Sequence, residues 1–152
     1  MNTSAAGRAF LEKNEGLRLT VYNDAGHPAI GYGHDLLPGE TFPGGITPAQ
    51  ADALLSTDLA TRFEPAVTAA VASAVPPSCT QNQFDALVDF CYNEGPRNLA
   101  IMLSHGWAQI PSQMPRWCYE EVEGVTVKSA GLAARRAAEV KMFTGVNAAP
   151  AA

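Results

Sequence analysis

Two helix-start signatures constrain the middle of this chain more than any other feature of its sequence. Thr47-Pro48-Ala49-Gln50 and Thr80-Gln81-Asn82-Gln83 each place a glutamine three residues after a threonine, which is the pattern of a capping box. After the first signature, apolar residues recur at every fourth position, at Leu55, Leu59, Phe63, Val67 and Val71. We therefore expect one helix from residue 47, which Pro65 must kink or split, and another from residue 80.

The helix that begins at residue 80 is expected to lie at the centre of the fold. Its apolar residues surround it almost completely, at Phe84, Leu87, Val88, Phe90 and Cys91. Gly95-Pro96 is expected to end it. Weaker patterns predict further helices at about residues 98–105, 113–122 and 130–143, with a loop at 124–129.

The N-terminal part carries the signals of a short helix followed by a β-hairpin. Thr3 or Ser4 can cap a helix that runs to about Asn14. Residues 17–22 then alternate as a half-buried strand does, residues 23–28 are dense in turn formers, and residues 29–34 form a second strand. We predict an α+β fold that is mostly helical, with a small N-terminal β lobe, a larger helical lobe and a substrate cleft between the two.

The chain shows no internal repeat and no linker, so a single domain is expected over residues 1–152. Within it we expect a first helix at 1–14, the β lobe at 15–46, the helical lobe at 47–145 and a tail at 146–152. Three cysteines cannot all pair with one another and lack metal-ligand spacing, so they are expected to be free thiols.

Charge and hydropathy argue against two classes of partner. The formal net charge is -5 and no basic patch stands out, which argues against nucleic-acid binding. Apolar stretches are interrupted well before the roughly 18 residues that a membrane helix needs, so stable membrane insertion is not expected. The first ten residues lack the apolar core of a secretion signal, which indicates synthesis in the cytoplasm.

Two carboxylates near the hairpin are candidates for chemistry. Glu15 ends the first predicted helix, and Asp24 follows nine positions later, in the hairpin turn. Hydrolysis of a glycoside needs one protonated acid and one ionised carboxylate. Burial between the lobes would raise the pKa of Glu15, whereas a loop aspartate near water stays charged. By themselves, however, two acids near a turn are usually only solvated.

The order of motifs along most of the chain resembles one known family. Its motifs are Glu15-Gly-Leu-Arg-Leu-Thr-Val-Tyr-Asn-Asp24, Ile30-Gly-Tyr-Gly-His34, the segment 80–88 with Asn93 and Gly95, and Gly131-Leu132 followed by Arg135-Arg136 and Glu139. This pattern is similar to that of the phage-type lysozymes, the endolysins of glycoside hydrolase family 24. The resemblance implies a lysozyme-like two-lobed fold.

The resemblance also implies roles for the two carboxylates. Glu15 is expected to be the proton donor, and Asp24 to hold or activate the attacking water. The bond cleaved would be the β-1,4 link from N-acetylmuramic acid to N-acetylglucosamine in peptidoglycan, with inversion expected. No cofactor and no metal are expected. The enzyme is expected to be a monomer that acts on the cell wall of the host after synthesis in its cytoplasm, released by a separate membrane-permeabilising holin.

One position departs from the family pattern. The family usually has a threonine that positions the water just before the Ile-Gly-x-Gly-His strand, but Ala29 stands there, and the loop after Asp24 is one residue shorter. Asp24 alone can suffice, His27 can substitute for the hydroxyl, or the activity can be weakened. The rivals to a hydrolase are therefore a catalytically silent wall-binding module and a transglycosylase.

Four further residues complete the predicted site. Arg135 aligns with a family arginine that pairs with the catalytic glutamate; Arg136 competes for that assignment, and either could be a solvated helix charge. His34 is expected to lock two elements together rather than to catalyse. Tyr32 and Asn93 are the candidate substrate-binding residues, with a core position and a helix-terminal backbone contact as their respective alternatives.

Overall fold

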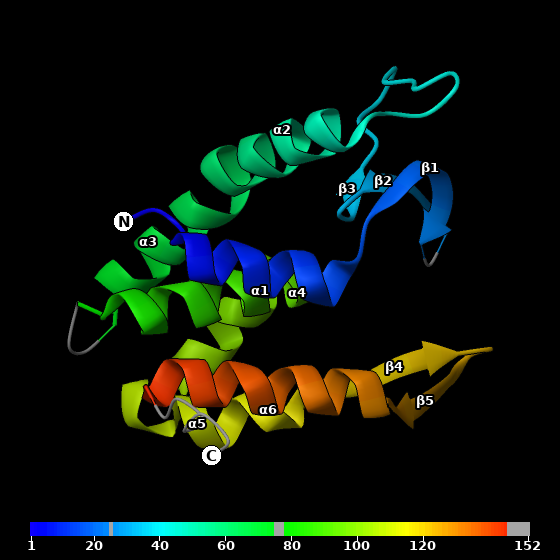
Figure 1. Ribbon diagram of the computed structural model, residues 1–152. Coiled ribbons are helices and arrows are strands. Elements are labelled where there is room, and N and C mark those ends of the chain that lie inside the picture. The colour runs from blue at the N-terminus through cyan, green and yellow to red at the C-terminus, as the bar shows by residue number, and fades with distance from the viewer. Residues whose placement is uncertain (25, 75–77, 146–152) are drawn as a thin grey trace, which may run out of the picture.

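Figure 1 shows the protein as a computed structural model, which describes residues 1–24, 26–74 and 78–145. Eleven elements are labelled by type and order, and three short turns complete the description. They are α1 (Ala5–Glu15), β1 (Arg18–Asp24), β2 (His27–Gly31), β3 (His34–Asp35), α2 (Pro48–Asp58), a π-helical turn (Leu59–Phe63), α3 (Glu64–Ala72), α4 (Gln81–Ser104), a 3-10 turn (Trp107–Gln109), α5 (Ile110–Gln113), a second 3-10 turn (Met114–Arg116), β4 (Tyr119–Val122), β5 (Val125–Lys128) and α6 (Ala130–Thr144). The expected fold class, α+β and mostly helical, is confirmed. Pro76-Pro77 and the tail at 146–152 lie outside the described residues.

Both capping boxes form as expected. The Thr47 hydroxyl accepts from the backbone N–H of Gln50, and the Gln50 side chain accepts in return from the N–H of Thr47 at 2.8 Å. Thr80 and Gln83 repeat this exchange at the start of α4. Ser4 and Ser129 cap α1 and α6 in the same way, through one bond each. Each cap contributes about 1 kcal/mol to the stability of its helix.

The helix that contains Pro65 continues through the proline instead of splitting. A proline lacks an N–H, and its ring clashes with the carbonyl four residues earlier. The chain accommodates this with a wider turn just before it, in which the N–H of Glu64 donates to the carbonyl of Leu59, five residues back. The apolar side chains at Leu59, Phe63 and Val67 stay buried on both sides of this turn.

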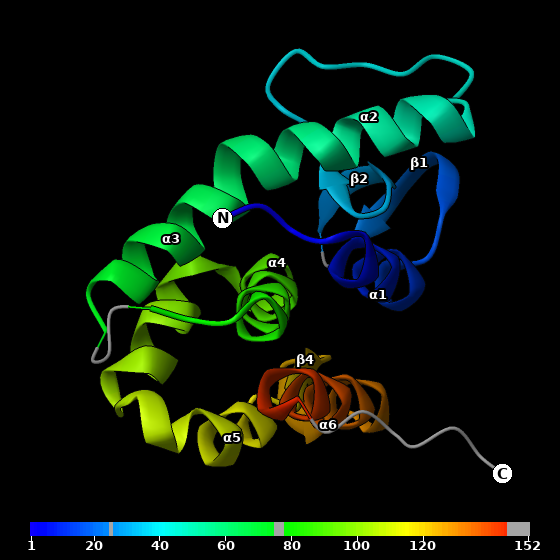
Figure 2. The ribbon, with the colours of Figure 1, turned by 60° about the vertical axis from the view of Figure 1, so that its left-hand side comes forward.

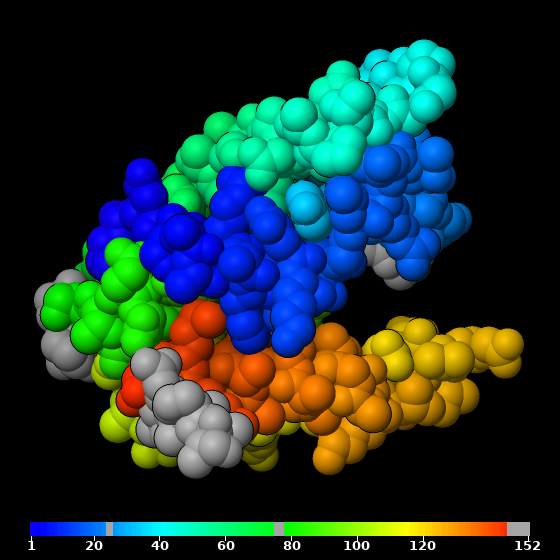
Figure 3. All heavy atoms as spheres, viewed as in Figure 1, coloured from blue at the N-terminus to red at the C-terminus, as the bar shows by residue number. Residues whose placement is uncertain are grey.

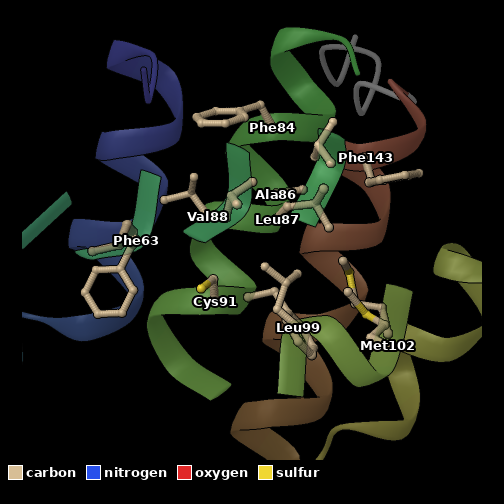
Figure 4. Packing of buried hydrophobic residues seen from close by; sticks show 14 of the residues in the cluster. Phe63, Phe84, Ala86, Leu87, Val88, Cys91, Leu99, Met102 and Phe143 are labelled. Atoms are coloured by element: carbon tan, nitrogen blue, oxygen red, sulfur yellow. The ribbon is translucent and has the colours of Figure 1, made fainter. Parts of the chain in front are cut away.

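Helix α4 lies at the centre, packed against α1, α3 and α6 (Figure 2). Its residues 84–91 are all buried, and Figure 4 shows several of them pointing into one cluster with Leu99, Met102 and Phe143. Gly95 interrupts the helix with φ 84° and ψ 162°, after which Pro96 starts a second half immediately. The expected stop at Gly95-Pro96 is therefore a kink between two directly joined helices.

Helix α1 is held against α4 at its first turn. Asp85, which is buried on α4, accepts hydrogen bonds from the N–H and hydroxyl of Ser4 and from the Gln81 side chain. A Cβ placed on Gly7 would lie 2.5 Å from the carboxyl carbon of Asp85. The two helices therefore approach so closely here that only a glycine fits at position 7.

The strand expected to be half-buried, at residues 17–22, is exposed instead. Leu17, Leu19 and Val21 have 41%, 37% and 43% of their surface exposed. The pairing of β1 with β2 is irregular between Arg18 and Tyr22, and the carbonyl of Leu19 accepts from the N–H of Ile46 at 2.8 Å. This bulge breaks the alternation, and β2 supplies the buried face of the sheet, packed against α2.

The helix predicted at residues 113–122 and the loop predicted at residues 124–129 are also wrong. A 3-10 turn is followed there by an antiparallel hairpin in which Tyr119 pairs with Lys128 and Val122 with Val125. Glu123 and Gly124 both adopt positive φ, at 51° and 79°, as a two-residue hairpin turn requires. All residues of β4 and β5 are exposed, so the hairpin projects from the end of the helical lobe. Among the residues that the structure describes, no helix is long and apolar enough to cross a bilayer.

Candidate active site

Helix α1 ends at Glu15 beside a hollow in the molecular surface. Figure 3 shows this hollow between the α1–β1 segment on one side and the segment of α6 and the β4–β5 hairpin on the other. Gly16, with φ 71°, ends α1 and turns the chain into β1. The Glu15 side chain is 18% exposed, so its carboxylate is largely covered and still reachable by solvent.

Arg135 of α6 holds the carboxylate of Glu15. Nη2 of Arg135 lies 2.7 Å from Oε1 of Glu15. Arg136, the competing residue, contacts Glu139 at 2.8 Å and the side chain of Asn93 at 2.8 Å instead. Both arginines are buried, so neither is an ordinary solvated helix charge.

The other carboxylate oxygen of Glu15 faces Gly33, in the turn between β2 and β3. Gly33 has φ +84°, and a Cβ built on it would lie 3.4 Å from Oε2 of Glu15 and 3.6 Å from the ring of Tyr92. Tyr92 is itself fixed, because its hydroxyl donates to the carbonyl of Tyr32 at 2.7 Å. An added methyl group would therefore touch the carboxylate and the ring without a clash, and it is the positive φ that favours a glycine here.

Replacing Gly33 with Ala is expected to lower activity about tenfold, because strain at its positive φ shifts the turn that contacts the Glu15 carboxylate. It should also cost about 1–2 kcal/mol of stability for a non-glycine residue at positive φ. Gly39→Ala is the matched control, since Gly39 has φ +85° and nothing within 4 Å of its Cβ position. Equal loss of activity in the two variants, at equal thermal stability, would contradict this.

Asp24 is the last residue of β1, where its backbone pairs with that of His27. The side chain of Asp24 lies outside the described part of the structure. Ala29 follows on β2, opposite Tyr22 and two pairs further from the turn, and it is completely buried. His27 is exposed on the same strand.

The two candidate substrate-binding residues differ in exposure. Asn93 is exposed near the end of the first half of α4, and its Oδ1 accepts from Arg136. This contact directs the amide nitrogen of Asn93 away from Arg136. Tyr32 is partly buried and packs against both apolar clusters of the protein.

Comparisons with known proteins agree on one family for this chain. The sequence pattern of the phage lysozyme family matches residues 12–139. The chain belongs to the phage lysozyme family. An endolysin of Lactococcus phage c2 is 33% identical over 152 residues, covering 94% of this chain and 60% of that protein. The chain thus spans about three fifths of the length of that relative.

Solved structures of a muramidase domain and of a phage endolysin share the fold. The muramidase domain of SpmX from Asticaccaulis excentricus has a TM-score of 0.74 at 32% identity, over 93% of this chain and 97% of that one. The endolysin from Escherichia coli O157:H7 phage FAHEc1 has a TM-score of 0.74 at 30% identity, over 98% and 97%. The predicted phage lysozyme family and lysozyme-like fold are therefore confirmed.

In this member of the phage lysozyme family, His34 of β3 contacts α2 and the loop that follows β3. Its Nδ1 lies 2.7 Å from Asp58 Oδ2 at the end of α2, and its Nε2 lies 3.0 Å from Oε2 of Glu40 in the following loop. Burial alone would lower the pKa of His34, but the hydrogen bonds to Glu40 and Asp58 outweigh it and raise the pKa above 6.5. A charged His34 donates to both carboxylates and links β3, the loop and α2.

This network predicts a stability that depends on pH. A raised histidine pKa stabilises the fold fully below 6.5, and this stabilisation is lost as pH rises through the raised value. The backbone N–H of Leu37, and then His34, lower the pKa of Glu40, whose stabilisation is present above 4.5 and is lost as pH falls through its lowered pKa. We expect the free energy of unfolding to fall by about 1 kcal/mol, the scale of one hydrogen bond, between pH 5.5 and pH 8.5.

Urea denaturation of the wild type and of His34→Gln at these two pH values checks this expectation. The variant should be less stable at pH 5.5 and should lose most of the pH dependence. An identical fall in both proteins would assign the dependence to other groups.

Two buried acids close to Glu15 were not predicted to belong to the site, although Glu139 is part of the family motif. Asp89 on α4 and Glu139 on α6 are both completely buried and lie around the two arginines. A signal for each was present, since Asp89 stands in an otherwise apolar helical run and Glu139 follows the arginine pair at helical spacing. Within the described ranges, no group of three or more His, Cys, Asp or Glu side chains is placed to hold a metal ion.

Proposed function

We propose that this chain is a lysozyme that hydrolyses the glycan strands of bacterial peptidoglycan. Membership of the phage lysozyme family and the endolysin and muramidase names of its relatives support this reaction class. The observation that carries the assignment to a site is the Glu15 carboxylate, held by Arg135 at 2.7 Å beside the hollow between the β1 segment and the β4–β5 hairpin.

Glu15 acts in this proposal as the general acid. Oε1 is held by Arg135, so the proton to be donated resides on Oε2 and passes to the oxygen of the leaving sugar. Asp24, at the turn of the hairpin, holds or activates the water that attacks the sugar carbon. The bond is the β-1,4 link from N-acetylmuramic acid to N-acetylglucosamine, and a water between the carboxylates gives inversion.

The remaining predicted residues support binding and geometry. Asn93 offers its amide NH2 to an N-acetyl group of the substrate, since its oxygen is already engaged by Arg136. Tyr32 holds Tyr92 through its carbonyl and is the second candidate for contact with the substrate. His34 fixes β3 to α2 and takes no part in proton transfer.

The chain is proposed to act as a monomer on the wall and to reach it after a holin permeabilises the membrane. A net charge of -5 gives no long-range attraction to an anionic wall, so binding depends on contacts in the groove.

Clearing of a purified cell-wall suspension, followed by mass analysis of the fragments, tests the proposal. We expect clearing and fragments with reducing ends. Anhydro ends would indicate a transglycosylase instead. Binding to walls without clearing would favour the silent module, for which Ala29 is the one supporting feature.

A further inference from the structure

A cluster of buried charges joins α4 to α6 next to Glu15. Arg135 donates from Nε to Oδ2 of Asp89 at 2.9 Å and from Nη2 to Oδ1 at 3.0 Å, which makes a bidentate ion pair. The same Nη2 atom lies 2.7 Å from Oε1 of Glu15. One guanidinium thus serves two carboxylates, one completely buried and one at the hollow.

Asp89 is the member of this cluster that makes two hydrogen bonds to Arg135. Burial, followed by a hydrogen bond to Asp89, raises the pKa of Glu139 to about 10, so Glu139 is protonated near neutral pH. The second arginine, Arg136, is turned toward Asn93, Glu139 and Glu94. Glu139 lies 3.6 Å from Nε of Arg135, whereas Asp89 and Glu15 contact Arg135 directly, at 2.9 Å and 2.7 Å.

We propose that Asp89 is a positioning residue that neutralises Arg135 inside the protein and so leaves Glu15 able to keep the proton that glycosidic cleavage requires. The inference rests on the proposed role of Glu15 as general acid. With Asp89 in place, Arg135 holds Glu15 by a hydrogen bond without imposing its full positive charge. An uncompensated guanidinium in contact with a carboxylate makes it lose its proton about one to three pH units lower.

The other groups around the cluster do not replace Asp89. Tyr92 faces Glu15 from α4, and burial raises the pKa of Tyr92, which keeps its hydroxyl neutral. Glu94 lies 3.7 Å from Arg136 and is the partner of that arginine. On the β1 side, Tyr22 is partly buried, and the side chain of Asp24 is outside the described residues.

The decisive comparison is between Glu139→Gln and the double variant Glu139→Gln with Asp89→Asn. Glutamine copies the protonated form of Glu139 and prevents it from ionising in place of Asp89. In the double variant, the fall in clearing rate with rising pH (the alkaline limb of the pH–activity profile) should occur about one pH unit lower than in Glu139→Gln. At a pH above this limb, the clearing rate of the double variant should be roughly tenfold lower than that of Glu139→Gln, and lowering the pH should restore it.

Asp85→Asn is the matched control for removal of a buried carboxylate. Asp85 lies one turn earlier on α4, is as buried as Asp89, and bonds to Ser4 and Gln81 rather than to Arg135. This variant should lower the melting temperature and leave the alkaline limb in place. Asp89→Ser in the Glu139→Gln background serves if the double variant does not fold.

A second measurement does not depend on activity. The titration of the Glu15 carboxyl carbon can be followed by ¹³C NMR, with its resonance assigned by its loss in Glu15→Gln. Its midpoint should be about one pH unit lower in the double variant than in Glu139→Gln. An unchanged midpoint overturns the proposal, whereas a shifted midpoint in a protein that clears no walls supports it and refutes the proposed function alone.

Discussion

Glu15→Gln is expected to reduce the rate of wall clearing by about 10²–10⁴-fold, the contribution of general acid catalysis. Glutamine keeps the size of the side chain and an oxygen that accepts from Arg135, which contacts Glu15 at 2.7 Å, but it has no proton to donate. The fold should therefore survive while protonation of the leaving sugar is lost. Initial rates of turbidity loss at equal protein concentration measure the effect.

Glu12→Gln is the control for this substitution. Glu12 lies on the same helix, is also partly exposed, and pairs with Arg8 at 2.8 Å rather than with Arg135. Its variant should clear walls at the rate of the wild type. A Glu15→Gln protein that clears walls at full rate would remove the acid assignment and require another proton donor.

Ala29→Thr is expected to raise turnover by about tenfold or more. Donors and acceptors that position a reacting group contribute about 10- to 1000-fold, and alanine provides none for the attacking water. Position 29 is suited to this role because its pair with Tyr22 lies only two backbone pairs from the one that joins Asp24 to His27. The measurement is the clearing rate at saturating wall concentration.

The control for this gain is Ala29→Val, which has the shape of threonine and no hydroxyl. Ala29 is completely buried, so both variants must find room for the same added volume. A threonine variant that is no faster than the valine variant, or no faster than the wild type, would show that the hydroxyl is not what the site lacks.

Local signals predicted the helices well because the interactions that set them span only a few residues. Thr47 and Gln50, like Thr80 and Gln83, satisfy each other within one turn, and the structure shows both pairs. The burial of residues 84–91 followed in the same way from an apolar surface that surrounds the helix. Contacts with distant segments were not needed for either conclusion.

The two errors arose where a distant or a very short-range contact decides the structure. The alternation of Leu17, Leu19 and Val21 predicts a half-buried strand, but the carbonyl of Leu19 accepts a hydrogen bond from the N–H of Ile46, far along the chain. At residues 113–122, the helical interpretation overlooked the dipeptide Glu123-Gly124, whose positive φ angles make a tight turn between Val122 and Val125.

The candidate site could be predicted only in part from the sequence. The resemblance supplied Glu15 and Asp24 and left Arg135 and Arg136 as competitors, because neighbouring residues on a helix face different directions. Only the packing of α6 on α4 and α1 directs Arg135 to Glu15. That Asp89 would share this arginine depends on three helices at once, and no spacing along the chain encodes it.

The contact between Gly7 and Asp85 has a consequence for how this enzyme can change through mutation. Helix α1 behaves as a short stiff rod, with Gly7 near one end and Glu15 at the other. Any larger side chain at residue 7 would push the rod sideways and carry the acid with it, about 12 Å away along the axis. Substitution at this position, remote from the candidate site, is therefore expected to displace the Glu15 carboxylate as well as to loosen the contact between α1 and α4.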